Sequence, residues 1–333
     1  MSQNFRLNNV GYINREKKIS FKFNGKKYFG YEGDTLASAL LANGVHLVGR
    51  SFKYHRPRGF IGAGVEESNA QVQLYSGAKT EPNAVATTVE LVEGLVAKSQ
   101  NCFPSVSFDF GAINNFLHKF FPAGFYYKTF MWPKNFWYKI YEPIIRKAAG
   151  LGVAPLKPDP DRYEHKYEYC DILIVGSGPS GLASALAAAK NGAKIILAED
   201  KPRFGGSLLT DEVTIGNKKG KDWADEMIAE LKSMPNVIVK NRSQVFGYYD
   251  HNMMVMSEKK KDHIENPTKF IPRQRLWYIR AKEVIISTGS IERPLVFGNN
   301  DRPGIMLASA AKEYLKVYGV LVGKKPIVFT NND

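Results

Sequence analysis

The sequence predicts an α/β protein in which a small α+β domain precedes a larger unit of alternating strands and helices. Two apolar runs, residues 172–175 and 194–198, flank a glycine-rich turn and an Ala- and Leu-rich helix. This order of strand, helix and strand is typical of a parallel sheet. The first hundred residues differ, because they alternate apolar and polar residues around Asn24-Gly25, which is typical of a β-hairpin.

The small domain is predicted to span residues 1–102. Residues 19–31 should form the hairpin, and Asp34 or Thr35 can cap a helix that ends at Gly44. A loop over residues 50–64 follows, and residues 85–92 supply a further strand.

Residues 103–168 are predicted to form a connecting segment. The part up to residue 141 lacks a helical period, so it either covers a domain or subunit surface or forms the core of an irregular connection. Residues 150–169 are expected to be an extended linker, because they carry several prolines. The aromatic residues of the segment are Phe103, Phe108, Phe110, Phe116, Phe120, Phe121, Phe125, Tyr126, Tyr127, Phe130, Trp132, Phe136, Trp137, Tyr138 and Tyr141.

The larger unit is predicted over residues 169–325. A helix over residues 180–191, an amphipathic helix around Trp223 and a strand over residues 237–240 are expected, followed by three β-like segments and an apolar strand that ends at Thr288-Gly289. The three β-like segments would form a β-meander between the third strand and the strand that ends at Thr288-Gly289. This order of elements is typical of two-dinucleotide-type flavoproteins. Residues 326–330 resemble the start of another buried strand, so we expect residues 326–333 to begin a truncated further domain.

The glycine-rich turn predicts a dinucleotide site. Gly176, Gly178 and Gly181, with Pro179 and Ser180 between them, form the G-x-G-x-x-G pattern between a strand and a helix. Gly176 permits the tight turn, Gly178 lets the backbone approach a pyrophosphate, and Gly181 lets helix and strand pack closely. The helix N-terminus would face the phosphate charge.

The second strand ends in Glu199-Asp200, where a carboxylate that binds ribose is expected. Glu199 is the stronger candidate, and Asp200 is either a second contact or a solvated neighbour. Carboxylates here disfavour a 2′-phosphate, so NAD or FAD is expected rather than NADP. The glycines do not separate NAD from FAD, because both contain ADP.

Composition narrows the class of protein. The net charge is +14, and an excess of Lys and Arg lies in the first 60 residues, but no nucleic-acid-binding motif accompanies it. We therefore expect no nucleic-acid partner. We expect no membrane partner either, because no apolar run is long enough to span a bilayer. Only two cysteines are present, and no apolar leader is visible, so a cytoplasmic location is predicted.

No catalytic residue is predicted, and no metal ligand set is expected. His55 lacks a visible orienting partner, so a structural role is favoured. Glu66 and Glu67 resemble a paired acid site, but adjacent loop acids are usually solvated. Cys102 and Cys170 are expected to be inert.

The chain resembles the N-terminal third of the alpha subunits of heterotetrameric sarcosine oxidases. The resemblance rests on linked motifs: Gly33-Asp34-Thr35-Leu with Ser51-Phe-Lys-Tyr-His55-Arg-Pro-Arg-Gly59, the glycine fingerprint with Glu199, and Asp301-Arg-Pro-Gly-Ile-Met-Leu-Ala308 with Val328-Phe-Thr-Asn-Asn-Asp333. It implies a β-grasp, ferredoxin-like first domain followed by a Rossmann-like dinucleotide-binding domain. Some relatives hold a two-iron cluster in the loop after His55, but residues 62–68 contain no cysteine, so no iron–sulfur cluster is expected.

The same resemblance implies the cofactors and partners. NAD would bind this chain, with FAD as the alternative; FAD would lie in a beta subunit and FMN at the interface, and smaller subunits would complete a hetero-oligomer. Folate would bind through the missing C-terminal part. Besides the fingerprint and Glu199, the site residues that the resemblance implies are Gly206, Ser207, Thr288 and Gly289.

Two functions therefore stand. The first is the NAD-binding part of a complex that demethylates sarcosine oxidatively to glycine, inactive without its partners. The second is a self-sufficient FAD- or NAD-dependent oxidoreductase of the pyridine nucleotide-disulfide type, or a subunit of an amine or amino-acid dehydrogenase. A self-sufficient reductase needs a redox dithiol, a cluster or a second nucleotide domain, none of which is evident in the sequence, so the first function is favoured.

Overall fold

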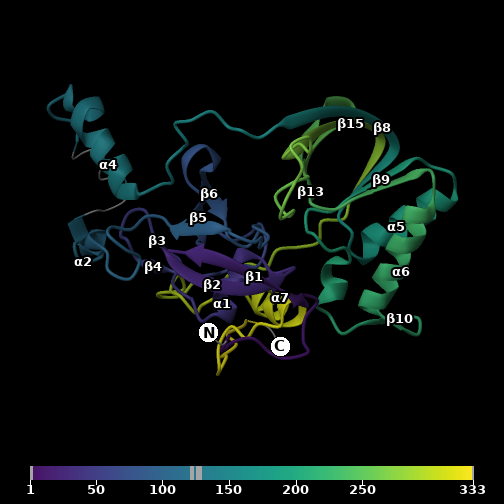
Figure 1. Cartoon of the computed structure of the whole chain (residues 1–333), viewed down its shortest axis with the longest axis horizontal. Helices are drawn as coiled ribbons and strands as arrows, with labels where there is room; N and C mark the ends of the chain where they lie inside the picture. The colour runs from purple at the N-terminus through teal and green to yellow at the C-terminus, as the bar shows by residue number, and fades with distance from the viewer. Residues whose placement is uncertain (1–2, 121–123, 125–129, 332–333) are drawn as a thin grey trace. The chain divides into compact units, whose positions relative to one another are not determined.

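The computed structural model describes residues 3–120, 124 and 130–331 (Figure 1). The chain forms two compact units, Met1–Pro160 with Glu292–Asp333, and Asp161–Ile291. The boundaries fall at Pro160 and Glu292, whereas the sequence placed them at residues 168 and 325. Two contacts explain the second difference, because Leu307 N donates to Ile61 O and Leu7 N donates to Gly319 O within the first unit.

The first unit is built on a five-stranded mixed sheet with the order β2-β1-β7-β5-β6. Strands β1 and β7 are parallel, and the other neighbours are antiparallel. Helix α1 (Leu36–Ala42) contributes only buried residues to the core of this unit. The strands are β1 (Asn14–Phe23), β2 (Lys26–Glu32), β5 (Gln71–Leu74), β6 (Glu81–Val85) and β7 (Val96–Ser99), and β3 (Gly49–Arg50) pairs separately with β4 (Pro57–Arg58).

The predicted hairpin and helix are confirmed. Asn24 and Gly25 both have positive φ, 50° and 78°, which is the backbone that a two-residue hairpin turn requires. Thr35, and not Asp34, caps α1: its side chain accepts from Ser38 N at 3.1 Å, and Thr35 N donates to Ser38 Oγ at 2.9 Å.

The strand predicted over residues 85–92 is wrong beyond Val85, where β6 ends. The backbone after Val85 bonds to the start of α1 instead of to a sheet, because Leu36 N donates to Val89 O and Ala37 N donates to Ala86 O. These bonds satisfy donors that a helix N-terminus leaves unpaired. Strands β5 and β7 were not expected.

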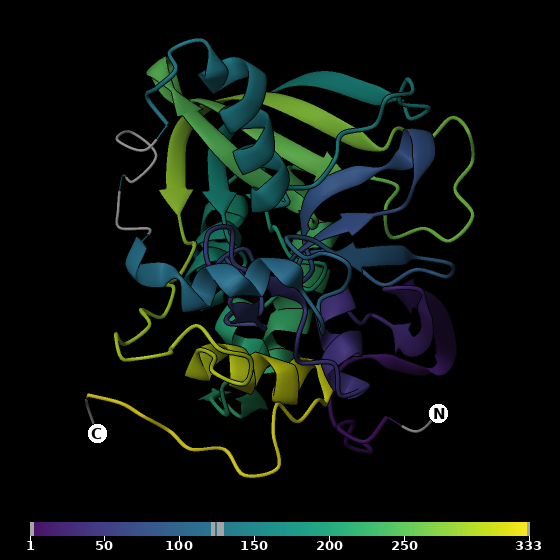
Figure 2. The same ribbon diagram turned by 90° about the vertical axis from the view of Figure 1, so that its left-hand side faces the viewer.

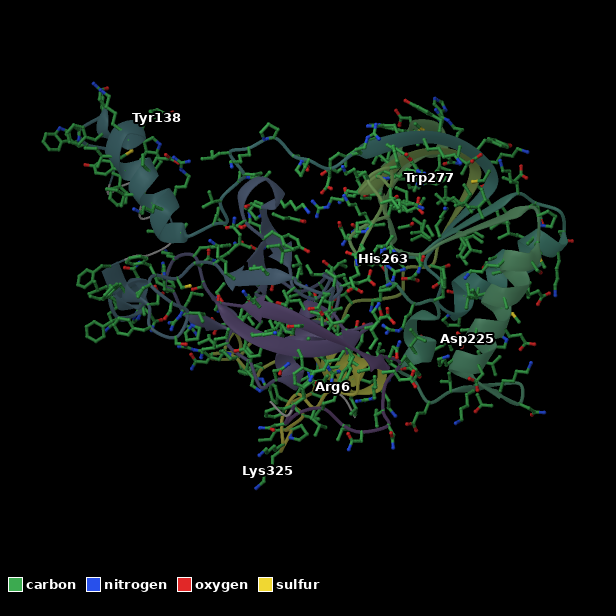
Figure 3. The ribbon with its side chains drawn as sticks, in the orientation of Figure 1. Arg6, Tyr138, Asp225, His263, Trp277 and Lys325 are labelled. Carbon is green, nitrogen blue, oxygen red and sulfur yellow. The ribbon has the colours of Figure 1, made fainter. Side chains whose placement is uncertain are left out.

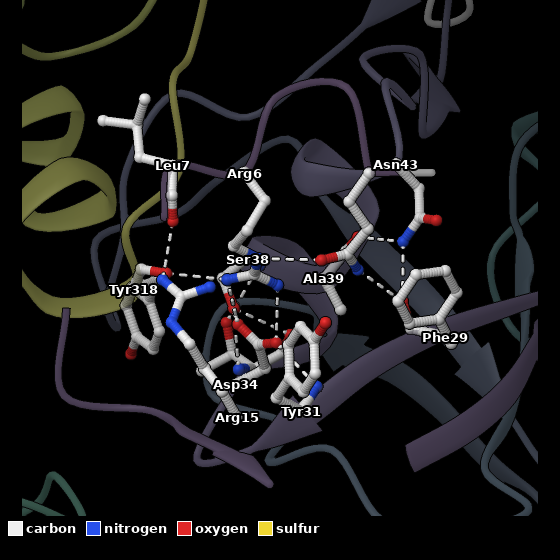
Figure 4. Close-up of polar contacts among 12 residues, drawn as sticks. Arg6, Leu7, Arg15, Phe29, Tyr31, Asp34, Ser38, Ala39, Asn43 and Tyr318 are labelled. Atoms are coloured by element: carbon white, nitrogen blue, oxygen red, sulfur yellow. Dashed lines mark hydrogen bonds and ion pairs between the residues drawn. The ribbon is translucent and has the colours of Figure 1, made fainter. Parts of the chain in front are cut away.

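A buried ion pair joins distant parts of the first unit (Figure 4). The Arg6 guanidinium binds both oxygens of Asp34 at 2.6 and 3.0 Å, and the two side chains are 4% and 0% exposed. Arg6 also donates to Tyr318 O at 2.7 Å, and Asp34 accepts from Ser38 Oγ at 2.7 Å. The pair thus connects the N-terminal segment, α1 and the end of helix α7 (Ala308–Tyr318); Figure 2 shows α7 in yellow beside the purple N-terminal strands.

The connecting segment is helical in part. Its elements are η2 (Phe110–Ala112), α2 (Ile113–Phe116), η3 (His118–Phe120), η4 (Trp137–Tyr141) and α4 (Glu142–Ala149). Large side chains remain exposed on it: Phe116 and Trp132 are 84 and 81% exposed, and Tyr138, which Figure 3 labels, is 83% exposed. Phe121, Phe125, Tyr126 and Tyr127 lie outside the described residues.

The second unit contains a six-stranded sheet with the order β12-β9-β8-β15-β14-β13. Strands β12, β9, β8 and β15 run parallel, and β14 and β13 continue antiparallel. The predicted linker is wrong from residue 163 onward, because β8 already pairs with β15 there. The strands are β8 (Tyr163–Val175), β9 (Ile195–Ala198), β12 (Val237–Lys240), β13 (Ser243–Tyr249), β14 (Met253–Lys259) and β15 (Gln274–Ile286), and a small ribbon joins β10 (Thr214–Ile215) to β11 (Lys218–Lys219).

Helices α5 (Pro179–Lys190) and α6 (Gly220–Ser233) lie side by side against the parallel strands (Figure 1). They bury one face of the sheet through Leu182, Ile228 and Leu231, which cluster with Ile174 and Leu197. On the other face, a second core gathers Leu173, Ile196, Met256, Trp277 and Ile279. The short helical turns outside these elements are η1 (Gly77–Lys79), η5 (Gly206–Leu209) and η6 (Asp250–Asn252).

Residues 326–330 do not form the predicted strand. Ile327 and Val328 are 94 and 76% exposed, and no strand of the described residues pairs with this segment. None of the helices that the structure describes combines the length and the apolar composition needed to cross a membrane.

The Arg6–Asp34 pair yields a stability prediction. Arg6→Ala should lower the free energy of unfolding by about 3–5 kcal/mol, because it leaves the Asp34 carboxylate buried without its counter-ion. The matched control is Lys17→Ala, which breaks the half-exposed 2.9 Å pair with Glu32 and should cost less than about 1 kcal/mol. Urea unfolding of the full chain measures both, and equal losses would contradict the assignment.

Candidate functional site

The glycine-rich turn joins β8 to α5 in the second unit. Gly176 has φ of 100°, and a Cβ there would meet the carbonyl of Ser287. A Cβ on Gly181 would overlap the carbonyl oxygen of Gly176. Gly178 is different, because its φ is −68° and no atom lies within 4 Å of a Cβ placed on it. Two glycines thus serve the close packing of strand and helix, and the third faces open space.

Helix α5 begins at this open glycine. Gly178 is the N-cap and makes no side-chain capping bond, Pro179 occupies the first turn, and both Pro179 and Ser180 are exposed. The first N–H groups of a helix have no partner within it, and the helix dipole adds positive potential at that end. The start of α5 can therefore receive an anionic group.

Glu199 lies at the end of β9 and binds the glycine turn. Its Oε2 accepts from Ser177 N at 3.0 Å and from Ser177 Oγ at 2.5 Å, while Oε1 accepts from Lys201 N at 3.0 Å. The residue is 7% exposed. A side-chain hydrogen bond with Asp200 adds to these three, so both carboxyl oxygens of Glu199 are engaged.

Burial changes the protonation of this carboxyl group. Removal from water, together with the neighbouring Asp200 side chain, raises the pKa of Glu199 to about 7, against the lowering effect of the hydrogen bonds from Ser177 and Lys201. Asp200 itself is exposed. Glu199 therefore titrates near neutral pH, and its acceptor capacity depends on pH.

The structure brings the other predicted residues to the same turn. Gly205 N donates to Ser177 O at 3.1 Å, and a Cβ on Gly206 would lie 3.0 Å from Gly178 Cα. Gly206 and Ser207 are both exposed at the start of η5. Thr288 lies beside Gly176, with its Cα 3.3 Å from the position of a Cβ there, and it is exposed together with Gly289.

Sequence reasoning missed Ser177, which ties Glu199 to the turn. Its position inside the fingerprint and its hydroxyl were visible, but its partner 22 residues away was not. His55 also gains an unforeseen partner: its Nδ1 lies 2.7 Å from Asp109 Oδ2 and its Nε2 lies 2.9 Å from Ala148 O. His55 is buried, and both of its partners belong to the connecting segment. Its two ring nitrogens therefore hold that segment.

The cysteines have the environment of unreactive thiols. Burial raises the pKa of Cys170 to about 12 and also raises the pKa of Cys102. The two lie in different units. No group of three or more His, Cys, Asp or Glu side chains in the described part of the chain is arranged to hold a metal ion.

Two family models match parts of the chain. Residues 16–102 match a 2Fe-2S iron–sulfur cluster binding domain, and residues 171–253 match an FAD dependent oxidoreductase. The second match supports a flavin-related oxidoreductase domain. The first unit does not fit the cluster that the first model describes, because a cluster needs four ligands and Cys102 is the only cysteine of that unit.

Curated relatives match nearly the whole of this chain. The chain is 52% identical over 329 residues to "Sarcosine oxidase subunit alpha" of Rhizobium meliloti (strain 1021), covering 99% of this chain and 33% of that protein. It is 34% identical to the protein of the same name in Corynebacterium sp. (strain U-96), covering 96% of this chain and 29% of that protein. The solved structure of L-proline dehydrogenase from P. horikoshii shares the fold, with a TM-score of 0.62, 19% identity, and coverage of 97% of this chain and 50% of that one. The chain therefore belongs to the family of sarcosine oxidase alpha subunits over nearly all its residues, and it spans about a third of the length of these relatives.

Proposed function

We propose that the second unit binds an ADP-containing dinucleotide, and that the chain is the dinucleotide-binding part of the alpha subunit of a sarcosine-oxidising complex. The observation that carries the proposal is the buried Glu199 carboxylate, fixed by Ser177 beside the open Gly178 at the start of α5. It places an acceptor for hydroxyl groups and a donor set for phosphate at one turn.

Each site residue has a proposed task. The N–H groups at the start of α5, including those of Ser180 and Gly181, donate to the pyrophosphate, which passes over Gly178. The Glu199 carboxylate accepts from a ribose hydroxyl, and Asp200 disfavours a 2′-phosphate next to it. The exposed Gly206, Ser207, Thr288 and Gly289 border the same turn and line the path of the dinucleotide.

NAD is the proposed ligand, and FAD is the alternative. NAD follows from the resemblance to sarcosine oxidase alpha subunits, whereas the match of residues 171–253 to an FAD dependent oxidoreductase favours FAD. Both ligands would present the same ADP half to Gly178 and Glu199. The dinucleotide supplies a hydride-accepting or electron-accepting ring, while the protein supplies its binding and orientation.

The proposed complex places amine oxidation outside this chain. FAD in a beta subunit oxidises the C–N bond, FMN lies at the interface, folate binds a further part of the alpha subunit, and smaller subunits complete the assembly. The exposed aromatic residues of the connecting segment and the basic first 60 residues are the proposed contact surfaces. A self-sufficient dithiol reductase is disfavoured, because Cys102 and Cys170 form no C-x-x-C pair.

The identity of the ligand is the first test. Chain purified under native conditions and then denatured should release NAD, or FAD in the alternative, in a ratio near one to one, as measured by mass spectrometry. If the site is empty after purification, added NAD or FAD should raise the melting temperature by mass action. An empty site that neither ligand stabilises contradicts the proposal.

Two glycine substitutions separate binding from folding. Gly178→Val should leave the melting temperature nearly unchanged, because the space is open, but should weaken dinucleotide binding at least about 100-fold by filling the path of the pyrophosphate. Gly181→Ala should lower stability by about 1–3 kcal/mol, because its Cβ overlaps the Gly176 carbonyl. Calorimetric titration and thermal unfolding measure both effects; full binding by the Gly178 variant would remove the pyrophosphate assignment.

Binding should depend on pH through Glu199. The ionised carboxylate accepts a ribose hydroxyl better than the neutral acid, so affinity for ADP-ribose should fall about tenfold between pH 8 and pH 6, on either side of the pKa near 7. Glu199→Gln should bind weakly and show little pH dependence over this range. A flat profile for the unchanged chain would argue against a ribose contact by Glu199.

The chain alone should not oxidise sarcosine, because the proposed flavin acceptor lies on another subunit. Oxygen-electrode assays of the purified chain should show no sarcosine-dependent uptake, and co-expression with a beta subunit and the remaining alpha-subunit sequence should restore it. Turnover by the isolated chain with peroxide release would disprove the dependence on partners.

A further inference from the structure

The loop between β4 and β5 closes around a buried carboxylate. Glu67 Oε2 accepts from Ile61 N at 2.7 Å and Gly62 N at 2.9 Å, and Oε1 accepts from Asn69 N at 2.6 Å and Ala70 N at 3.0 Å. The residue is 4% exposed. Four backbone donors therefore converge on one carboxylate, which is the arrangement of an anion-binding loop.

The neighbouring Glu66 provides a partly exposed comparison. Its Oε1 accepts from Ala63 N at 2.7 Å and from Gly64 N at 2.9 Å. Both acids bind loop N–H groups, but only Glu67 is buried. This corrects the expectation that Glu66 and Glu67 are solvated.

The loop belongs to the part of the chain that matches an iron–sulfur cluster binding domain but cannot ligate a cluster through cysteine. In such domains, hydrogen bonds to the sulfur atoms of the anionic cluster are among the interactions that tune it. Here the inward-facing N–H groups meet a carboxylate that is part of the chain. We propose that Glu67 is a built-in anion that closes this loop without a metal cluster, and that the closed loop is the seat on which α7 docks.

Two bonds carry the second half of the proposal. The residues whose N–H groups donate to Glu67 also accept from the α7 segment, because Leu307 N donates to Ile61 O at 2.9 Å and Tyr314 Oη donates to Gly62 O at 2.9 Å. Tyr314 is fully buried, and its ring centroid lies 6.5 Å from that of Phe60. The Glu67 carboxylate thus fixes the orientation of the Ile61 carbonyl directly, because Ile61 O and Gly62 N belong to one peptide group, and it holds the preceding end of the residue that supplies Gly62 O.

Charge and shape can be separated at residue 67. Glu67→Gln keeps the size but replaces one acceptor oxygen by an NH₂ group, which faces two N–H donors and leaves them unpaired. The four N–H groups that bind Glu67 form a concave anion site, a nest. Glu67→Ala empties this nest and leaves its four donors without the carboxylate. A small carboxylate anion from solution can then bind to these four N–H groups. If Glu67 only filled space, added carboxylate would not stabilise Glu67→Ala more than the unchanged chain.

The experiment compares the full chain with Glu67→Ala, Glu67→Gln and the control Glu66→Ala. Thermal unfolding is followed in chloride and in acetate or formate at equal ionic strength. We expect both Glu67 variants to melt about 10 °C lower than the unchanged chain. Acetate or formate should restore a large part of that loss in Glu67→Ala only, and hydrogen exchange in residues 308–318 should rise in the variants and fall again with the rescue.

Clear outcomes overturn the proposal. Glu67→Gln with unchanged melting temperature would show that the charge is dispensable, and carboxylates that affect Glu67→Ala no more than the unchanged chain would show that the nest does not select an anion. If Glu67→Ala does not fold in chloride, its refolding yield in formate replaces the melting temperature, and no gain in yield counts against the proposal. Protection of residues 308–318 that stays unchanged in both Glu67 variants would remove the docking half.

Discussion

The burial of the Glu199 carboxylate is the constraint on which the candidate site depends. Its bonds to Ser177 and Lys201 fasten the end of β9 to the glycine turn after β8 and to the loop that follows β9. A buried carboxylate without such donors would be costly, and the turn without the carboxylate would lose the partner of Ser177. In the proposed complex with a dinucleotide, the same group that holds the turn in shape also accepts a ribose hydroxyl.

Buried carboxylates play a related part in the first unit. Asp34 binds Arg6 next to the start of α1, and Arg6 in turn binds the end of α7. Glu67 connects the two ends of the β4–β5 loop, because it accepts from Ile61 N and from Ala70 N. The partners differ, since Asp34 has a guanidinium and Glu67 has only N–H groups. Burial raises the pKa of Glu67 despite its four hydrogen bonds. Asp34 thus connects segments that are distant in sequence, whereas Glu67 organises the backbone of its own loop, and desolvation is the opposing cost in both cases.

Local signals in the sequence were reliable where the structure is local. The Asn24-Gly25 hairpin, the α1 cap and the strand–turn–helix around Gly176 depend on neighbours within a few residues. The start of β8 was not predictable in this way, because Tyr163 is polar and exposed and gains its strand conformation by pairing with Gln274. Ser177 was missed for the same reason, because its role arises only when two segments meet. The partners of Glu67 lie within six residues, but the loop conformation that turns their N–H groups towards it has no signal in the sequence.

The central claim is that one ADP-containing dinucleotide binds at the turn after β8. Titration calorimetry of the full chain with ADP-ribose, the half shared by NAD and FAD, tests it most directly when combined with hydrogen exchange and repeated with the 2′-phosphorylated analogue. The account predicts saturable one-to-one binding of ADP-ribose to chain freed of any retained ligand, new protection in residues 176–182, and clearly weaker binding of the phosphorylated analogue. Absence of binding, or protection that spares the turn, would contradict it.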